Sequence, residues 1–504
     1  MNIIENIKKY ANKNPERIAY IINGETLTYE ELENTSNRLA SRIQQEAKED
    51  KTPIIVYGHK NKYMLVSFLA CVKSGRAYCP IDISVPIERT KMILQTVKPK
   101  VILATEELNI RNENVWRLED IKKYSETCED INEEHLVKNS DTFYIIFTSG
   151  STGTPKGVQI TMECLDNFLK WSSNFKGIEE KEGLTFINQA PFSFDLSVMD
   201  LYTCLATGGT LFALDKKAQN NMSEMFELLK KSNANVWVST PSFVNMCLAD
   251  KLFNKELLPQ MNTFLFCGEI LPNITANKLL DRFDSVNVIN TYGPTESTVA
   301  VTSVLVTKEM INNTTSLPVG KTKPGTNIFI RNEDNKNLSD GEKGEIIIVG
   351  DTVSTGYFKN EEKTRKAFDT CKIDNKEYRA YKTGDLGYIK DEQLYYCGRI
   401  DFQIKLHGYR IEIEDIENNI LKHLDIKNVA VIPQYESDQI TVKYLKAFIE
   451  TNNKIDNNLE ETIKIKDKLK EYLPNYMIPK KITFIDKIPM TNNSKIDRKA
   501  LRGM

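Results

Sequence analysis

A short hydrophobic run that ends abruptly in a loop of small residues constrains this chain more than any other feature. Residues 144–147 are four consecutive bulky apolar or aromatic residues, and the next ten, 148–157, are almost all glycine or hydroxyl-bearing. Such a run, bounded by turn-forming residues, favours a buried strand over a helix. Glycines allow positive φ, so the N–H groups of the loop can converge on one ligand. The pattern predicts a polyphosphate site.

The loop offers hydroxyl donors, glycines and one cation. The predicted nucleotide contacts are Thr148, Ser149, Gly150, Ser151, Thr152, Gly153 and Lys156. Pro155 stands where a Walker A motif would have its second glycine, so the sequence does not fit that motif. A flexible linker is the alternative interpretation, but linkers rarely follow a strand or end in Pro-Lys-Gly.

Bulk properties narrow the function classes. At 504 residues the chain exceeds one ordinary domain, and 67 Lys and Arg balance 69 Asp and Glu, which gives no sign of a nucleic-acid partner. The start lacks a signal-peptide pattern and no apolar run is long enough to span a bilayer, so we expect a cytoplasmic protein without membrane insertion. The nine cysteines form no Cys-x-x-Cys pair, and neither His-Glu-x-x-His nor Gly-x-Ser-x-Gly occurs, which disfavours the common zinc and serine hydrolases.

A carboxylate within an apolar segment is the second candidate feature. Asp195 follows Pro-Phe-Ser-Phe and precedes Leu-Ser. A buried acid needs a partner. From the residues alone, a cap for a helix beginning near Ser197 is favoured over a contact with a ligand cation such as an ammonium group.

A second segment shows the same pattern, a strand that ends in a turn with groups suited to a ligand. The segment 286–296 predicts a strand that ends in a turn offering an aromatic ring, a hydroxyl and the carboxylate of Glu296. An aromatic face can stack on a purine, and one carboxylate beside a triphosphate suits Mg²⁺. Further on, Asp385 lies in a predicted Thr-Gly-Asp turn, where a carboxylate can accept ribose hydroxyls; an ordinary turn aspartate is the alternative.

Alternating helix and strand patterns predict an α/β and α+β multidomain protein. We expect a large N-terminal domain at 1–398, built from two α/β layered subdomains and a small β-barrel. A hinge at 399–402 and a smaller, mobile C-terminal α+β domain at 403–504 complete the prediction. Thr28 and Glu31 form a capping-box signature for a helix to about residue 46.

Seven segments, taken in order, resemble the adenylate-forming superfamily of peptide-synthetase adenylation domains, acyl-CoA synthetases and luciferases. They are 148–157, Phe194-Asp195, 290–296, 381–385, 398–405, 473–479 and 495–499. Within the superfamily the chain is most similar to the D-alanine:D-alanyl carrier protein ligases, on 188–200, 264–269 and 405–410. The family's last loop usually reads Asn-Gly-Lys, whereas Ser494 precedes Lys495 here.

The resemblance implies a ligase that activates D-alanine with ATP and Mg²⁺, then transfers it to the phosphopantetheine thiol of a D-alanyl carrier protein, the first step of lipoteichoic acid D-alanylation. It makes Lys495 and Glu296 catalytic, with Glu296 holding Mg²⁺, and Asp195 the anchor of the substrate ammonium in place of a cap. Cys267, Val299 and Lys495 complete the D-alanine site, and Cys267 is implied to discriminate enantiomers. Asp401 is implied as the hinge. The implied ATP contacts beyond the first loop are Asn290, Thr291, Tyr292, Gly293, Pro294, Thr295, Asp385, Tyr396, Cys397, Gly398, Arg399 and Lys495.

Three rival functions follow from the same motifs: activation of another amino acid, ligation of an acyl or aryl acid, and a catalytically silent binding protein. Acyl and aryl acids carry no ammonium and would leave Asp195 without its ligand. A silent homologue would be expected to have lost some of Lys156, Glu296, Asp385 and Lys495, and all four are present.

Overall fold

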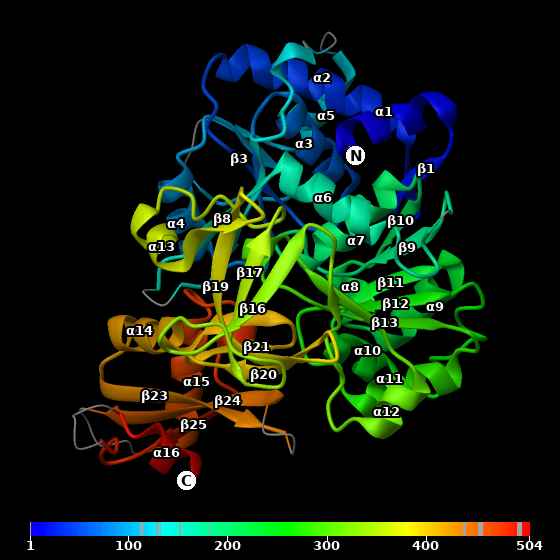
Figure 1. Cartoon of the computed structure of the whole chain (residues 1–504). Coiled ribbons are helices and arrows are strands. Elements are labelled where there is room, and N and C mark those ends of the chain that lie inside the picture. Colours follow the sequence, from blue (N-terminus) through cyan, green and yellow to red (C-terminus); the bar gives the residue numbers. More distant parts are fainter. Residues whose placement is uncertain are drawn as a thin grey trace. The chain divides into compact units, whose positions relative to one another are not determined.

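The computed structural model describes residues 2–110, 114–127, 131, 133–150, 153–179, 181–436, 440–451, 457–490 and 496–504. The chain divides into two compact units. The larger contains 1–83, 97–146 and 157–396, and the smaller contains 84–96, 147–156 and 397–504. Figure 1 shows the order of the elements along the chain. The predicted hinge at 399–402 stays a prediction.

One sheet is six-stranded, in the order β6-β5-β3-β4-β7-β8. Its strands are β3 (Ile54–Tyr57), β4 (Tyr78–Ile81), β5 (Ile102–Ala104), β6 (Val115–Trp116), β7 (Thr142–Thr148) and β8 (Lys156–Thr161). All four residues of β3 are buried, as expected for a parallel strand that helices cover on both faces. The strand predicted at 144–147 is confirmed as part of β7.

The second sheet is nine-stranded, in the order β15-β14-β13-β12-β11-β9-β10-β1-β2. Its strands are β1 (Ile18–Ile22), β2 (Glu25–Thr28), β9 (Thr185–Asn188), β10 (Thr210–Ala213), β11 (Val236–Ser239), β12 (Thr263–Phe266), β13 (Asn287–Tyr292), β14 (Thr302–Leu305) and β15 (Lys321–Thr322). The strands β10, β9, β11, β12 and β13 are parallel neighbours. Two sheets of this kind confirm the predicted pair of α/β layered subdomains.

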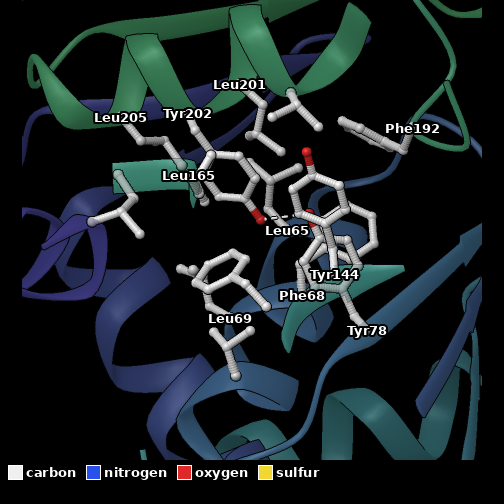
Figure 2. Packing of buried hydrophobic residues seen from close by; sticks show 14 of the residues in the cluster. Leu65, Phe68, Leu69, Tyr78, Tyr144, Leu165, Phe192, Leu201, Tyr202 and Leu205 are labelled. Atoms are coloured by element: carbon white, nitrogen blue, oxygen red, sulfur yellow. Dashed lines mark hydrogen bonds between the residues drawn. The ribbon is translucent and has the colours of Figure 1, made fainter. Parts of the chain in front are cut away.

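Two hydrophobic clusters cover opposite faces of the nine-stranded sheet. Along β11, Val236 and Val238 belong to one cluster and Trp237 to the other, because successive side chains of a strand point to opposite faces. The first cluster also holds Tyr78, Tyr144 and Tyr202, and the hydroxyl of Tyr202 donates to that of Tyr78 at 2.7 Å. Figure 2 shows this packing.

The helices of the larger unit follow the predicted layering. They are α1 (Ile3–Lys13), α2 (Tyr29–Ala47), α3 (Lys62–Lys73), α5 (Leu118–Thr127), α6 (Met162–Ser172), α7 (Leu196–Ala206), α8 (Lys216–Gln219), α9 (Met222–Ser232), α10 (Pro241–Cys247), α11 (Asn273–Arg282), α12 (Lys308–Asn313) and α13 (Glu361–Ala367). The capping box at the start of α2 is confirmed: Thr28 Oγ1 accepts from Glu31 N, and Glu31 accepts from Thr28 N.

A five-stranded sheet occupies the region predicted as a small barrel. Four strands follow the order β16-β17-β19-β18, and β20 pairs with β19. The strands are β16 (Thr326–Arg331), β17 (Gly344–Gly350), β18 (Phe368–Ile373), β19 (Lys376–Lys390) and β20 (Gln393–Arg399). The strand pairings of the described residues do not close this sheet into a barrel, because β16, β18 and β20 each pair with only one strand of the sheet.

The smaller unit is α+β, as predicted for the C-terminal part. A hairpin of β21 (Gln403–Leu406) and β22 (Tyr409–Glu412) leads into α14 (Ile413–His423). A three-stranded sheet then follows in the order β23-β24-β25. The strands of this sheet are β23 (Ile426–Tyr435), β24 (Val442–Thr451) and β25 (Lys481–Phe484), and the other helices of the unit are α15 (Asn458–Leu469) and α16 (Arg498–Arg502). The helix α4 (Ile87–Val97) also belongs to the smaller unit, except for its last residue. No helix in the described part of the chain has the length and apolar character needed to cross a bilayer.

Candidate functional site

The predicted substrate residues of the larger unit gather at one edge of the nine-stranded sheet. Asp195 follows β9, Cys267 follows β12 directly, and Glu296 follows β13. These strands run parallel, so their carboxyl ends open at the same edge. Ligands bind at this edge in open α/β sheets.

Asp195 contacts the loop that follows β13. The residue is 9% exposed, and its carboxylate accepts a hydrogen bond from Thr295 Oγ1 at 2.6 Å. It occupies the position before α7, but its side chain makes no capping hydrogen bond. Its φ of −63° and ψ of −21° are already helical, whereas a capping side chain normally needs an extended backbone. The cap interpretation is therefore wrong.

Glu296 is fully buried and is held by a residue that the sequence did not single out. The hydroxyl of Tyr357 donates to Glu296 Oε1 at 2.8 Å, and Ser354 N donates to the Glu296 carbonyl at 2.8 Å. Tyr357 lies in the loop after β17, in a Ser-Thr-Gly-Tyr segment that reads as an ordinary turn. A pairing of residues 61 positions apart leaves no local sequence signal.

Val299 connects the loop after β13 to Cys267. Thr298 and Val299 have φ values of 59° and 69°, in the left-handed region that β-branched residues rarely adopt. The turn is fixed by Val301 N donating to the Tyr292 carbonyl at 2.7 Å. The Cys267 thiol donates to the Val299 carbonyl at 3.5 Å, and both side chains are buried. Strained backbone of this kind clusters at ligand sites.

Tyr292 and Asp385 also meet in the larger unit. The Tyr292 hydroxyl donates to Asp385 Oδ2 at 2.6 Å, and the ring of Tyr396 lies 6.0 Å from that of Tyr292. Burial and the charge of Asp385 raise the pKa of Tyr292 well above its ordinary value, so the hydroxyl stays protonated.

The predicted turn around Asp385 is wrong. Asp385 lies inside strand β19, where residues 383–385 bulge opposite the single residue Ile346 of β17. Gly384, with a φ of 68°, permits the bulge. A bulge next to a functional site re-aims a side chain, which a turn prediction from Thr-Gly-Asp alone does not reveal.

The other residues of the 290–295 segment make polar contacts or pack closely against the backbone. Asn290 Nδ2 donates to the Pro318 carbonyl at 2.9 Å, while its Oδ1 is buried without a hydrogen-bond partner in the described part of the chain. Thr291 Oγ1 donates to the Phe266 carbonyl. Gly293 packs against Ala300: a Cβ at Gly293 would lie 2.5 Å from Ala300 Cα. Pro294 precedes a short 3-10 helix, Thr295–Ser297.

The described residues of the first loop up to Lys156 lie in the smaller unit, and Gly157 lies in the larger one. Gly150 closes the loop on itself, since a Cβ there would lie 2.2 Å from the Thr154 carbonyl oxygen. Ser149 Oγ donates to the Arg410 carbonyl at 2.8 Å, and Lys156 Nζ lies 3.3 Å from Glu412 Oε1. Thr148 Oγ1 is buried without a hydrogen-bond partner among the residues described. Gly153 has a φ of 77°.

The predicted hinge residue forms an ion pair. Arg399 Nε and Nη2 donate to the two carboxylate oxygens of Asp401 at 2.6 and 2.7 Å. Burial alone would raise the pKa of Asp401, but the Arg399 guanidinium outweighs it and lowers that pKa below its ordinary value. Gly398, with a φ of 108°, and Cys397 lie at the end of β20. Ser151, Thr152 and Lys495 lie outside the described residues.

Comparisons with known proteins identify the family of this chain. Residues 7–358 match the model of the AMP-binding enzyme family, and residues 415–495 match that of the AMP-binding enzyme C-terminal domain. The chain is 48% identical to the D-alanine–D-alanyl carrier protein ligase of Bacillus licheniformis, over 100% of this chain and 99% of that protein. It belongs to the D-alanine–D-alanyl carrier protein ligase family of AMP-binding enzymes. The corresponding ligase of Bacillus cytotoxicus is 46% identical, with 99% of each chain covered.

Solved structures of distant relatives share the fold. The holo form of PA1221, a peptide-synthetase protein containing adenylation and carrier domains, superposes with a TM-score of 0.85 at 22% identity, over 99% of this chain and 84% of that one. The Vibrio cholerae adenylation domain AlmE, in complex with glycyl-adenosine-5'-phosphate, superposes with a TM-score of 0.83 at 21% identity, over 99% of this chain and 97% of that one. At these identities the likeness establishes the adenylate-forming fold.

Proposed function

We propose that this ligase activates D-alanine as D-alanyl-AMP and transfers the D-alanyl group to the phosphopantetheine thiol of a D-alanyl carrier protein. The identity of 48% over the full length of a curated ligase supports the substrate. The observation that carries the chemistry is the buried carboxylate of Asp195, held by Thr295 at the carboxyl edge of the sheet. A buried carboxylate is suited to a substrate ammonium because the ion pair forms away from water.

Adenylation brings two anions together. The carboxylate of the amino acid attacks the α-phosphorus of ATP, the bond to the β-phosphate breaks, and pyrophosphate leaves. Positive charge must offset the repulsion, and fixed charges are usually the largest single contribution to such catalysis. We assign this role to Lys495 and to the N–H groups and Lys156 of the first loop. The nucleoside is assigned to 290–295, Asp385, Tyr396 and Arg399.

The surroundings of Glu296 fit a magnesium ion bound together with the triphosphate. Mg²⁺ is usually held by one or two carboxylates and by phosphate oxygens, and no group of three or more His, Cys, Asp or Glu suited to a metal occurs among the described residues. One carboxylate, oriented by Tyr357, is enough for a metal that is bound together with its nucleotide. Bound there, the ion would neutralise the charge of the phosphates, and Tyr357 would orient the carboxylate.

The second half-reaction needs a different set of groups. The carrier thiol attacks the carbonyl carbon of the adenylate, a thioester forms and AMP leaves. Lys495 acts only before this step, so the C-terminal domain would turn about Asp401 between the two reactions. Cys267 and Val299 would confine the side chain of the substrate to a methyl group. We place the reaction in the cytoplasm, at the start of lipoteichoic acid D-alanylation.

Amino-acid-dependent release of pyrophosphate with Mg-ATP tests the proposal. D-alanine, L-alanine, glycine, D-serine and acetate are compared in parallel, and D-alanine should give the highest kcat/KM. Transfer is then followed as thioester formation on a phosphopantetheinylated D-alanyl carrier protein. A higher kcat/KM for acetate would exclude the ammonium site at Asp195, and nucleotide binding without pyrophosphate release would favour a silent binding protein.

A further inference from the structure

A buried lysine contacts the segment that carries the amino-acid anchor. Lys60 follows β3 of the six-stranded sheet and is only 6% exposed. Its Nζ donates to Asn188 Oδ1 at 2.6 Å and to the Ala190 carbonyl at 2.6 Å. The third side of the ammonium faces the ring of Phe192, with Nζ 3.9 Å from the ring centroid. All three partners lie on the five residues that begin at the end of β9.

This segment leads directly to Asp195. Phe194 N donates to the Pro191 carbonyl at 3.0 Å, and Ser197 Oγ donates to the Phe194 carbonyl at 2.7 Å, so the turn before α7 is continuous with the part that Lys60 holds. We propose that Lys60 is a positioning residue for the amino-acid anchor: it fixes 188–192 and thereby the place of Asp195 against Thr295. The inference rests on the proposed function, because it concerns the same substrate.

A second buried charge completes the arrangement. Asp200 lies on α7, is fully buried, and accepts from Asn188 Nδ2 at 2.9 Å. Asn188 therefore bridges the ammonium of Lys60 and the carboxylate of Asp200. Burial lowers the pKa of Lys60 and raises that of Asp200, and the attraction between the two groups opposes both shifts. Burying the ammonium of Lys60 costs desolvation free energy that an apolar side chain would avoid. Its contacts with two oxygens and a ring of one loop therefore indicate a positioning role.

Another buried lysine offers a matched control. Lys73, at the end of α3, is 1% exposed, and its Nζ donates to Glu33 Oε2, Ser36 Oγ and Asn37 Oδ1 at 2.7–2.8 Å. Its partners all lie on α2. Lys73→Met thus removes a buried ammonium of similar environment that holds two helices together and contacts nothing near Asp195.

The test compares steady-state pyrophosphate release by the full-length enzyme and by Lys60→Met and Lys73→Met. Lys60→Met should raise the KM for D-alanine about tenfold or more, with the KM for ATP within about twofold of the wild type, because a misplaced anchor weakens one substrate only. Lys73→Met should lower the unfolding temperature and leave both KM values unchanged. Equal changes in both KM values of Lys60→Met, or no change in either, would overturn the proposal.

The double variant Lys60→Met/Asp200→Asn separates positioning from charge burial. It removes both members of the charge pair, so it leaves no lone buried carboxylate and is the variant to use if Lys60→Met does not fold. A raised KM for D-alanine in the double variant supports positioning, and a normal KM contradicts it. The wild-type enzyme is measured first: if it does not prefer D-alanine, the proposed substrate fails, and the variants are then measured with the preferred amino acid.

Discussion

Two buried carboxylates at the same edge of the sheet are held in similar ways, although we propose different ligands for them. Both carboxylates accept a hydrogen bond from a hydroxyl, Asp195 from Thr295 at 2.6 Å and Glu296 from Tyr357 at 2.8 Å. Thr295 precedes Glu296 directly, so one loop serves both groups. We propose an ammonium as the ligand of Asp195 and a phosphate-bound metal as the ligand of Glu296. If these proposed ligands are right, replacing the two groups should affect different substrates.

The largest effect is expected from Asp195→Asn. The amide keeps the shape of the side chain but removes the charge that pairs with the substrate ammonium. Breaking a buried ion pair costs about 3–5 kcal/mol, so kcat/KM for D-alanine should fall about a thousandfold. Pyrophosphate release with varied D-alanine and saturating ATP measures it. A proportional rise in the KM for ATP would contradict separate roles for the two carboxylates.

Glu296→Gln should act on the nucleotide side. We expect pyrophosphate release to fall about a hundredfold, as after loss of one electrostatic group of an active site. The magnesium concentration needed for half-maximal rate should rise, since the carboxylate would no longer bind the ion. Titration of MgCl₂ at fixed ATP measures this shift. An unchanged magnesium dependence would remove Glu296 as the metal ligand, and a change confined to D-alanine would reverse the assignment of the two groups.

Local patterns were predictable from the sequence, and long-range contacts were not. The capping box of Thr28 and Glu31 and the strand before the glycine loop were confirmed because all their determinants are neighbours in the chain. The cap interpretation of Asp195 was wrong because its partner, Thr295, lies 100 residues away. Lys60 and Asn188 are 128 residues apart, and neither segment contains a local sequence pattern that predicts their hydrogen bond.

The resemblance extended what the residues alone had indicated. The residues singled out Glu296 and Asp195, and the resemblance added Cys267 and replaced the cap interpretation of Asp195. The structure places all three in loops after strands of one sheet. It did not name Tyr357, whose hydroxyl orients Glu296. The bulge that carries Asp385 was also missed, because strand register depends on the partner strand and not on Thr-Gly-Asp itself.

Tyr357→Phe should reproduce part of the Glu296→Gln effect. A hydrogen bond to a charged group contributes about 1.5–3 kcal/mol, so the rate of pyrophosphate release should fall at least about tenfold at low magnesium. Excess magnesium should restore much of the rate, because the carboxylate itself remains. The KM for D-alanine serves as the control and should stay near the wild-type value. Failure of magnesium to restore any activity would indicate that Tyr357 does more than orient Glu296.

Thr295→Val should give the smallest effect, on the other side of the comparison. Valine keeps the branched shape but cannot donate to Asp195, so the carboxylate loses one orienting bond. Because the substrate ammonium can still pair with the charge, we expect the KM for D-alanine to rise only about fivefold, below the full cost of a hydrogen bond to a charged group. Thr295→Ser retains the hydroxyl and should restore the wild-type KM. If Thr295→Val instead shifts the magnesium dependence, the loop acts through Glu296, and the two carboxylates form one coupled site.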